Sequence, residues 1–117
     1  MNFEAEISGL VERCSGARGA AIVDPDGIPV VTIPESSTLE ALGTELAAVV
    51  AGVERTGREF EHGGLEQLSV WAEDAVVLLT SLAAGYFLML VLDRTALVGK
   101  GRLLSRVAGA RLYSEFV

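Results

Sequence analysis

Few side chains in this sequence have the chemistry and the spacing of a catalytic or metal-binding site. His62 and Cys14 are the only histidine and cysteine, and they lie far apart in the chain. A protein zinc site needs about four nitrogen, sulfur or oxygen ligands, so this pair cannot form one. The sequence also has no phosphate-binding loop, zinc-protease motif or nucleophile elbow. We therefore predict no enzymatic activity, no metal and no cofactor.

The segment Asp24-Pro25-Asp26-Gly27 resembles the start of a calcium loop, because two carboxylates alternate ahead of a glycine. An EF-hand also needs a third early ligand and a glutamate at the end of its loop, and the sequence supplies neither. Proline followed by aspartate and glycine is typical of a tight turn. We therefore predict a hairpin turn between strands at residues 19–23 and 28–33.

Composition excludes several classes of function. The chain of 117 residues has a net charge of −7, which disfavours general binding to nucleic acid. A single cysteine indicates a reducing compartment, and we predict a cytoplasmic protein. Residues 75–92 carry no charge and are long enough to span a membrane, but Thr80 and Ser81 interrupt them and acids flank them. We therefore predict two buried strands there and no membrane insertion.

The elements that could present a binding surface are organised around one long helix, predicted at residues 38–60. Ser37 and Glu40 fit a capping box at its start. Small residues recur at every fourth position, at Gly43, Ala47 and Ala51. These residues either favour helix formation or allow a second helix to approach closely. The apolar residues that predict its core-facing side are Leu39, Leu42, Leu46, Val49, Val50, Val53 and Phe60.

A strand is predicted at residues 65–73, where apolar and polar residues alternate so that one face is less buried. Trp71 lies on the wetter face. It packs under a neighbouring helix or acts as a contact anchor, since tryptophan is common among the residues that dominate protein interfaces. Two apolar strands follow at residues 75–81 and 86–92.

Amphipathic helices are predicted at both ends of the chain. The first covers residues 1–14, and the last is capped by Thr95 and extends through Phe116. We expect an inward face on the last helix made of Leu97, Leu103, Leu104, Val107, Ala108, Leu112 and Phe116.

The order of elements is therefore α-β-β-α-β-β-β-α, which predicts an α+β fold. We expect a five-stranded antiparallel sheet with helices on both faces, in one domain that spans residues 1–117.

With this order established, the sequence resembles the Roadblock/dynein light chain family. The resemblance begins at Leu10 and continues through the segment 16–27, Gly-Ala-Arg-Gly-Ala-Ala-Ile-Val-Asp-Pro-Asp-Gly. The later elements are also similar, including Leu97, Gly99 and Arg102 near the start of the last helix. The resemblance implies a profilin-like Roadblock sandwich. It also implies a homodimer or close heterodimer in which the second helices pack together and the third strands pair across a two-fold axis.

By this resemblance, the chain is expected to be a non-catalytic regulator or scaffold that binds a Ras-like small GTPase, as in bacterial GTPase-activating proteins of the MglB type. The alternative is a structural adaptor, like the light chains of the dynein motor, without nucleotide dependence. Arg55 and Arg58 are the candidates for an arginine finger, although both fit an ordinary solvated surface. The expected partner-binding residues are Thr44, Ala48, Arg55 and Arg58. The expected dimer interface consists of Gly43, Ala47, Val50, Ala51, Glu54, Leu68, Val70 and Trp71.

Overall fold

The computed structural model describes residues 2–116 and contains the predicted order of helices and strands. Met1, the predicted start of the first helix, lies outside this range. Short 3-10 turns follow β4 and α3. The main elements are α1 (Phe3–Arg13), β1 (Ala17–Val23), β2 (Pro29–Ile33), α2 (Ser37–Glu59), β3 (Gln67–Trp71), β4 (Val76–Ser81), β5 (Phe87–Leu92) and α3 (Val98–Tyr113).

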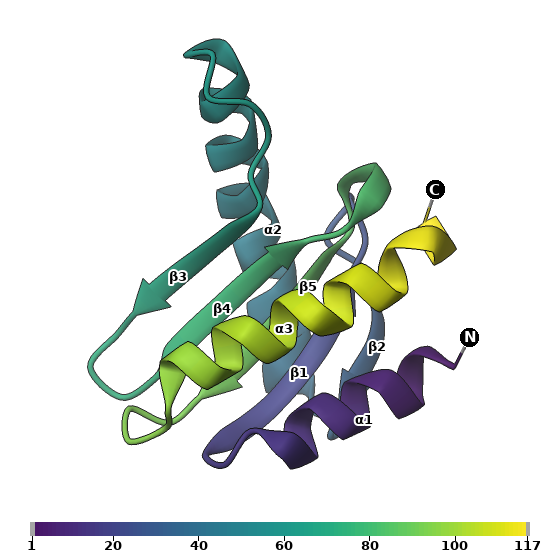
Figure 1. Cartoon of the computed structure of the whole chain (residues 1–117), viewed down its shortest axis with the longest axis vertical. Helices are drawn as coiled ribbons and strands as arrows, with labels where there is room; N and C mark the ends of the chain where they lie inside the picture. Colours follow the sequence, from purple (N-terminus) through teal and green to yellow (C-terminus); the bar gives the residue numbers. More distant parts are fainter. Residues whose placement is uncertain (1, 117) are drawn as a thin grey trace.

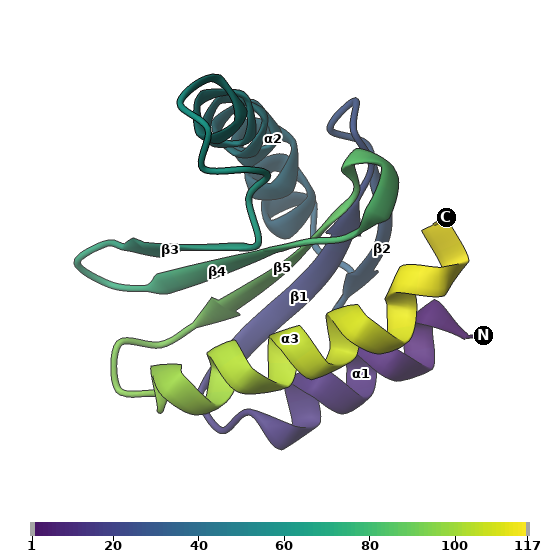
Figure 2. The same ribbon diagram turned by 45° about the horizontal axis from the view of Figure 1, so that its top comes forward.

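The five strands form one antiparallel sheet in the order β2-β1-β5-β4-β3, which confirms the predicted fold class. Helix α2 covers one face, over β1 and β2, and helices α1 and α3 lie side by side on the other (Figures 1 and 2). The apolar run at residues 75–92 forms β4 and β5, as predicted. Among residues 2–116, none of the helices combines the length and the apolar composition that a membrane span needs.

Because the sheet is covered on both faces, it has two apolar cores. The core under α1 and α3 contains large buried side chains such as Leu10, Leu78 and Leu90. The core under α2 contains Val23, Val77, Leu79 and Met89 of the sheet, with Val50 of the helix. The second core is smaller, and α2 does not extend over the whole of its face of the sheet (Figure 2).

The β1–β2 hairpin turn forms as predicted. One oxygen of the Asp24 carboxylate accepts hydrogen bonds from the amides of Asp26 and Ile28, each at 2.9 Å. Gly27 adopts a φ of 84°, which costs little in glycine. The hydroxyl of Thr44 donates to the Gly27 carbonyl at 2.6 Å and ties the turn to α2. Asp24 therefore has a structural role in the turn.

Helix α2 differs from its prediction at its start and on its inner face. Its N-cap is Ser36, whose hydroxyl accepts from the Leu39 amide, so the prediction that Ser37 caps the helix is wrong. Val49, Val53 and Phe60 were expected to face the core, yet all three are exposed. The C-terminal turns of α2 extend past the sheet (Figure 1).

Helix α3 begins at Val98 and has no side-chain cap, so Thr95 does not play the predicted role. Its sheet-facing side is made largely of small residues, Gly101, Ser105, Ala108 and Gly109. A Cβ atom at Gly101 would lie 2.9 Å from a methyl group of Leu92, so glycine allows this close approach. The helix is consequently rotated, and three residues predicted to face inward are exposed instead, namely Leu97, Leu103 and Val107.

Candidate protein-binding surface

Gly43 is buried against the sheet of its own chain. A Cβ atom there would lie 2.9 Å from Cγ2 of Val23 and 3.7 Å from Cε of Met89. The first distance is shorter than a van der Waals contact, so α2 can lie this close to β1 only because residue 43 is a glycine. The sheet of the same chain therefore covers Gly43, and its place in a dimer interface stays a prediction.

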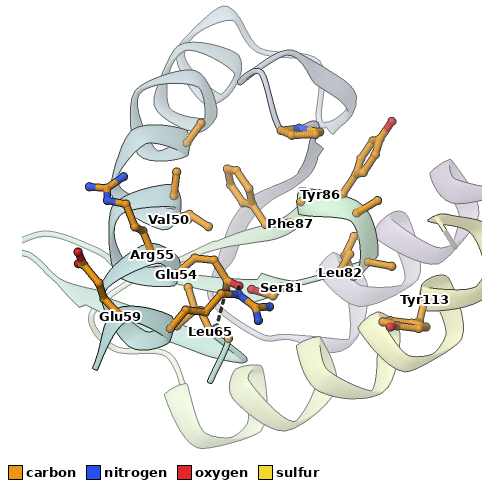
Figure 3. A pocket seen from close by; sticks show the side chains of 18 residues that line it. Val50, Glu54, Arg55, Glu59, Leu65, Ser81, Leu82, Tyr86, Phe87 and Tyr113 are labelled. Carbon is orange, nitrogen blue, oxygen red and sulfur yellow. Dashed lines mark hydrogen bonds and ion pairs between the residues drawn. The ribbon is translucent and has the colours of Figure 1, made fainter. Parts of the chain in front are cut away.

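Four other residues predicted in the dimer interface, Ala47, Val50, Ala51 and Glu54, line an open cavity of about 890 Å³ beside α2. The opposite wall comes from the β4–β5 connection, with Pro25 of the β1–β2 turn and Tyr113 of α3 also contributing. In Figure 3, Val50 and Glu54 point across the cavity toward Phe87 and Ser81. The position of these α2 residues in a dimer stays a prediction.

Glu54 fixes the loop that leads from α2 to β3. Its carboxylate accepts hydrogen bonds from the Leu65 amide and from Nε of Arg58, the latter at 2.7 Å. The hydrogen bond from Leu65, followed by the guanidinium of Arg58, lowers the pKa of the Glu54 carboxyl below its ordinary value. Glu54 therefore determines where β3 begins relative to α2.

The opposite flank of α2 is apolar and exposed. Val49 is 44% exposed and Val53 is 38% exposed. At about 100° per residue, Val49 lies about 160° around the helix from the cavity-lining Ala51. The cavity side of α2 faces the β1–β2 turn, whereas β3 extends away on the other side (Figure 2). Val49 and Val53 therefore lie on the flank of α2 that faces away from the cavity.

Leu68 and Val70 of β3 are half-buried and pack against the core under α2. We use the name α2–β3 surface for the exposed apolar side chains of Val49 and Val53 on α2 together with the half-buried Leu68 and Val70 of β3. Large exposed apolar patches, when rimmed by polar residues, mark sites of protein–protein contact.

Trp71 lies on the opposite face of the sheet from Leu68 and Val70, because side chains alternate along a strand. It is 56% exposed, and the guanidinium carbon of Arg94 lies 5.1 Å from the centroid of its ring. Arg94 also donates to the carbonyl of Ala72 at 3.1 Å. Trp71 is therefore not packed beneath a helix, and its other suggested role as a contact anchor stays a prediction.

The expected partner-binding residues differ in how free they are to bind. The Thr44 hydroxyl donates a hydrogen bond to the Gly27 carbonyl, and Arg58 forms an ion pair with Glu54. Ala48 is exposed on the solvent side of α2. Arg55 points away from the centre of the cavity in Figure 3 and makes no ion pair with any residue in the range 2–116. Arg55 is therefore the α2 cation best placed to contact another protein.

Among the described residues, no group of three or more histidine, cysteine, aspartate or glutamate side chains could hold a metal ion. Sequence reasoning missed that Val49 and Val53 are exposed. The available signal was the length of the predicted apolar stripe, which continues to Phe60 at the C-terminal end of α2.

A family model of the Roadblock/LC7 domain matches residues 4–93. The chain belongs to the Roadblock/LC7 family. The match covers the elements from α1 to β5, so it contains both α2 and β3, which form the α2–β3 surface.

Solved Roadblock structures share the whole fold. The Roadblock/LC7 domain from Streptomyces avermitilis superposes with a TM-score of 0.89 at 14% identity, covering 98% of each chain. The gliding protein MglB from Thermus thermophilus has a TM-score of 0.81 at 22% identity, covering 95% of this chain and 87% of that one. MglC from Myxococcus xanthus has a TM-score of 0.76 at 27% identity, covering 98% and 99%.

The predicted likeness to profilin is also confirmed. Profilin IA from Acanthamoeba castellanii superposes with a TM-score of 0.64 at 13% identity and covers 97% of this Roadblock chain and 98% of its own. At that identity the likeness concerns the fold alone.

Proposed function

We propose that this Roadblock protein is a non-catalytic regulator that forms a homodimer and binds a Ras-like small GTPase, altering its nucleotide cycle. The observation that carries the proposal is the α2–β3 surface, since a soluble protein gains stability by covering such an apolar area. The family resemblance supplies the class of partner, and the similarity to MglB supports a bacterial-type regulator.

One edge of the sheet supports the proposed dimer. Strand β3 is an outer strand of the sheet, and an exposed edge is prone to pair with another chain unless it is covered. A two-fold axis beside β3 brings the β3 strands together and sets the Val49 and Val53 flank of each α2 toward its copy. The same interface therefore covers the sheet edge and the apolar flank.

The GTPase contacts the solvent side of the two α2 helices. In this arrangement Ala48 and Arg55 remain accessible, because they lie on neither the sheet-facing side nor the Val49 flank. Arg55 provides a cation for the acidic or phosphate-bearing surface of a nucleotide-binding partner. Arg58 is bonded to Glu54 and is not assigned a catalytic role. Arg55 is proposed here as a binding residue only.

The proposal is tested by titrating the purified chain with Ras-like GTPases from the same genome, each loaded with GDP or with a non-hydrolysable GTP analogue. We expect binding that differs between the two nucleotide states and weakens at least tenfold in Arg55→Ala. Arg106→Ala is the matched control, because Arg106 is an exposed arginine on α3, on the other face of the sheet.

Each other outcome has a definite meaning. Failure to bind any of these GTPases in either state contradicts the proposal. Equal binding to the GDP and GTP-analogue forms favours the structural adaptor. Equal loss of binding in the two arginine variants shows that the α2 side of the sheet is not the contact surface.

A further inference from the structure

The outward side of α3 carries an apolar stripe. Leu103 is 62% exposed, Val107 is 39% exposed, and Ala110 is exposed beside them. At about 100° per residue, these three residues lie within about 60° of one another around the helix. Because Gly101 and Ala108 occupy the sheet-facing side of α3, the stripe points to solvent.

Cations line both sides of this stripe. Lys100 and Arg111 lie about 60° around α3 to one side of it, and Arg106 and Arg102 lie about 70° to 110° to the other. All four side chains are exposed. Residues 94–117 hold five of the nine lysines and arginines and one acid, although the whole chain has a net charge of −7. The result is a local basic region with an apolar centre, the α3 surface, made of Lys100, Arg102, Leu103, Arg106, Val107, Ala110 and Arg111.

Most of these cations are available to a partner. Lys100 and Arg102 form no ion pair with another of the described residues. Arg106 lies 4.0 Å from the Glu66 carboxylate, and this pair contributes little because both side chains are exposed. Arg111 pairs with an acid of α1 at 3.4 Å. Three of the four cations can therefore exchange water for the carboxylates of another protein.

A second cavity, of about 580 Å³, opens along the Arg106 side of the stripe. Gly109, Ala110 and Tyr113 of α3 line one side of it, and Leu82, which follows β4, lines the other. Because Gly109 has no side chain, the space beside α3 stays open. A partner that lies along α3 can therefore insert an apolar side chain here.

We propose that the α3 surface binds an acidic amphipathic helix of another protein. Its apolar residues, which recur every three or four positions, match the spacing of Leu103, Val107 and Ala110. Its flanking aspartates and glutamates pair with the cations on both sides of the stripe, which fixes the register and rejects basic segments. The α3 surface lies on the opposite face of the sheet from α2 (Figure 2), so this contact is independent of the GTPase contact proposed above.

An anionic membrane fits the α3 surface less well. Helix α1 lies beside α3 on the same face of the sheet (Figure 2), so a flat surface resting on α3 also approaches α1. Glu12 lies about 160° around α1 from the buried Leu10 and points outward, and Glu4 is exposed as well. These carboxylates repel anionic headgroups. A single helix that follows α3 avoids them.

Two designed peptides test the proposal on the full chain. One is an amphipathic helix of about 18 residues, long enough to be helical, with leucines along one side and glutamates on both flanks. The other has the same composition in scrambled order. Both carry a fluorophore, and binding is measured by anisotropy. The whole chain is acidic, so non-specific attraction opposes binding of either peptide. We expect the amphipathic peptide to bind at least tenfold more tightly than the scrambled one.

Three variants locate the site. Leu103→Glu and Lys100→Glu should each weaken binding at least tenfold. A carboxylate at position 100 lies in the first turn of α3, where it suits the helix dipole, so the fold is kept. Ile28→Glu is the matched control, because Ile28 is 61% exposed and lies at the β1–β2 turn. Circular dichroism checks that all three variants are folded.

Every other result overturns the proposal. No binding of the amphipathic peptide, or equal binding of the scrambled one, shows that the α3 surface does not recognise an acidic helix. Unchanged binding in Leu103→Glu and Lys100→Glu, or an equal loss in Ile28→Glu, places the contact elsewhere. Sedimentation with vesicles of phosphatidylserine and phosphatidylcholine tests the alternative occupant. Binding to these vesicles without binding to the peptide replaces the acidic helix with a membrane surface.

Discussion

Replacing Val53 with aspartate should dissociate the dimer and leave the protomer folded. Burying a valine side chain contributes at least about 1.5 kcal/mol. Val53 is 38% exposed, so burying that exposed part in the interface contributes ~0.6 kcal/mol. The two-fold axis buries two copies of Val53, which doubles the contribution to ~1.2 kcal/mol. Two buried carboxylates without partners add at least about 2 kcal/mol. The sum of about 3 kcal/mol corresponds to a dimer weakened by a factor of about 100 or more.

Ala51→Asp is the matched comparison, because Ala51 is also exposed but lies on the cavity side of α2. Sedimentation velocity over a range of concentrations measures the dissociation constant, and circular dichroism checks that both variants keep their helices. We expect Val53→Asp to be monomeric and Ala51→Asp to dimerise normally. The reverse result would show that the line of small residues, and not the α2–β3 surface, forms the contact between helices.

Three further predictions concern single protomers. Gly43→Leu should lower the free energy of unfolding by about 1–3 kcal/mol in a denaturant titration, because its side chain meets Val23; unchanged stability would contradict the packing of α2. Glu54→Gln should cost stability at neutral pH, since the Leu65 amide lowers the pKa of the carboxyl. That contribution is present above the ordinary value of 4.5 and is lost as pH falls through the lower folded value, so the two proteins should converge in acid. A difference that grows in acid would refute this sign. Ser105→Ala should raise the unfolding free energy by up to about 1 kcal/mol, because the buried Ser105 hydroxyl has no hydrogen-bond partner among the described residues; a loss of stability would show that the hydroxyl is satisfied.

The order of helices and strands could be predicted because each rests on local signals. The turn at Asp24-Pro25-Asp26-Gly27 and the alternation in β3 are examples, since they depend on backbone preferences and on a period of two residues. Local signals also predicted that the uncharged run at residues 75–92 forms two strands, because Thr80 and Ser81 mark where the first strand ends.

The surfaces of the helices could not be predicted in the same way. Helix α2 continues past the sheet at its C-terminal end (Figure 1), and the apolar Val53 is 38% exposed although its spacing is that of a core residue. On α3, small residues such as Gly101 approach the sheet and turn Leu103 outward. In both helices the hydropathy pattern is regular, and the distance between helix and sheet decides which residues are buried.

The burial of Gly43 has the same origin. A glycine in a helix indicates that another segment could pack closely there. The sequence does not determine whether that segment is a second helix or the sheet of the same chain. In the structure Val23 fills the space, and only the remaining small residues of α2 are left for other contacts.

The most direct test of the proposed function is the mass of the assembly that forms with a GTPase. Light scattering on the purified chain, alone and with a Ras-like GTPase bound to a GTP analogue, reports both stoichiometry and nucleotide dependence. We predict a homodimer that binds the GTPase in one nucleotide state more tightly than in the other. A protomer that stays monomeric, or a dimer that ignores every GTPase offered to it, would contradict the proposed function.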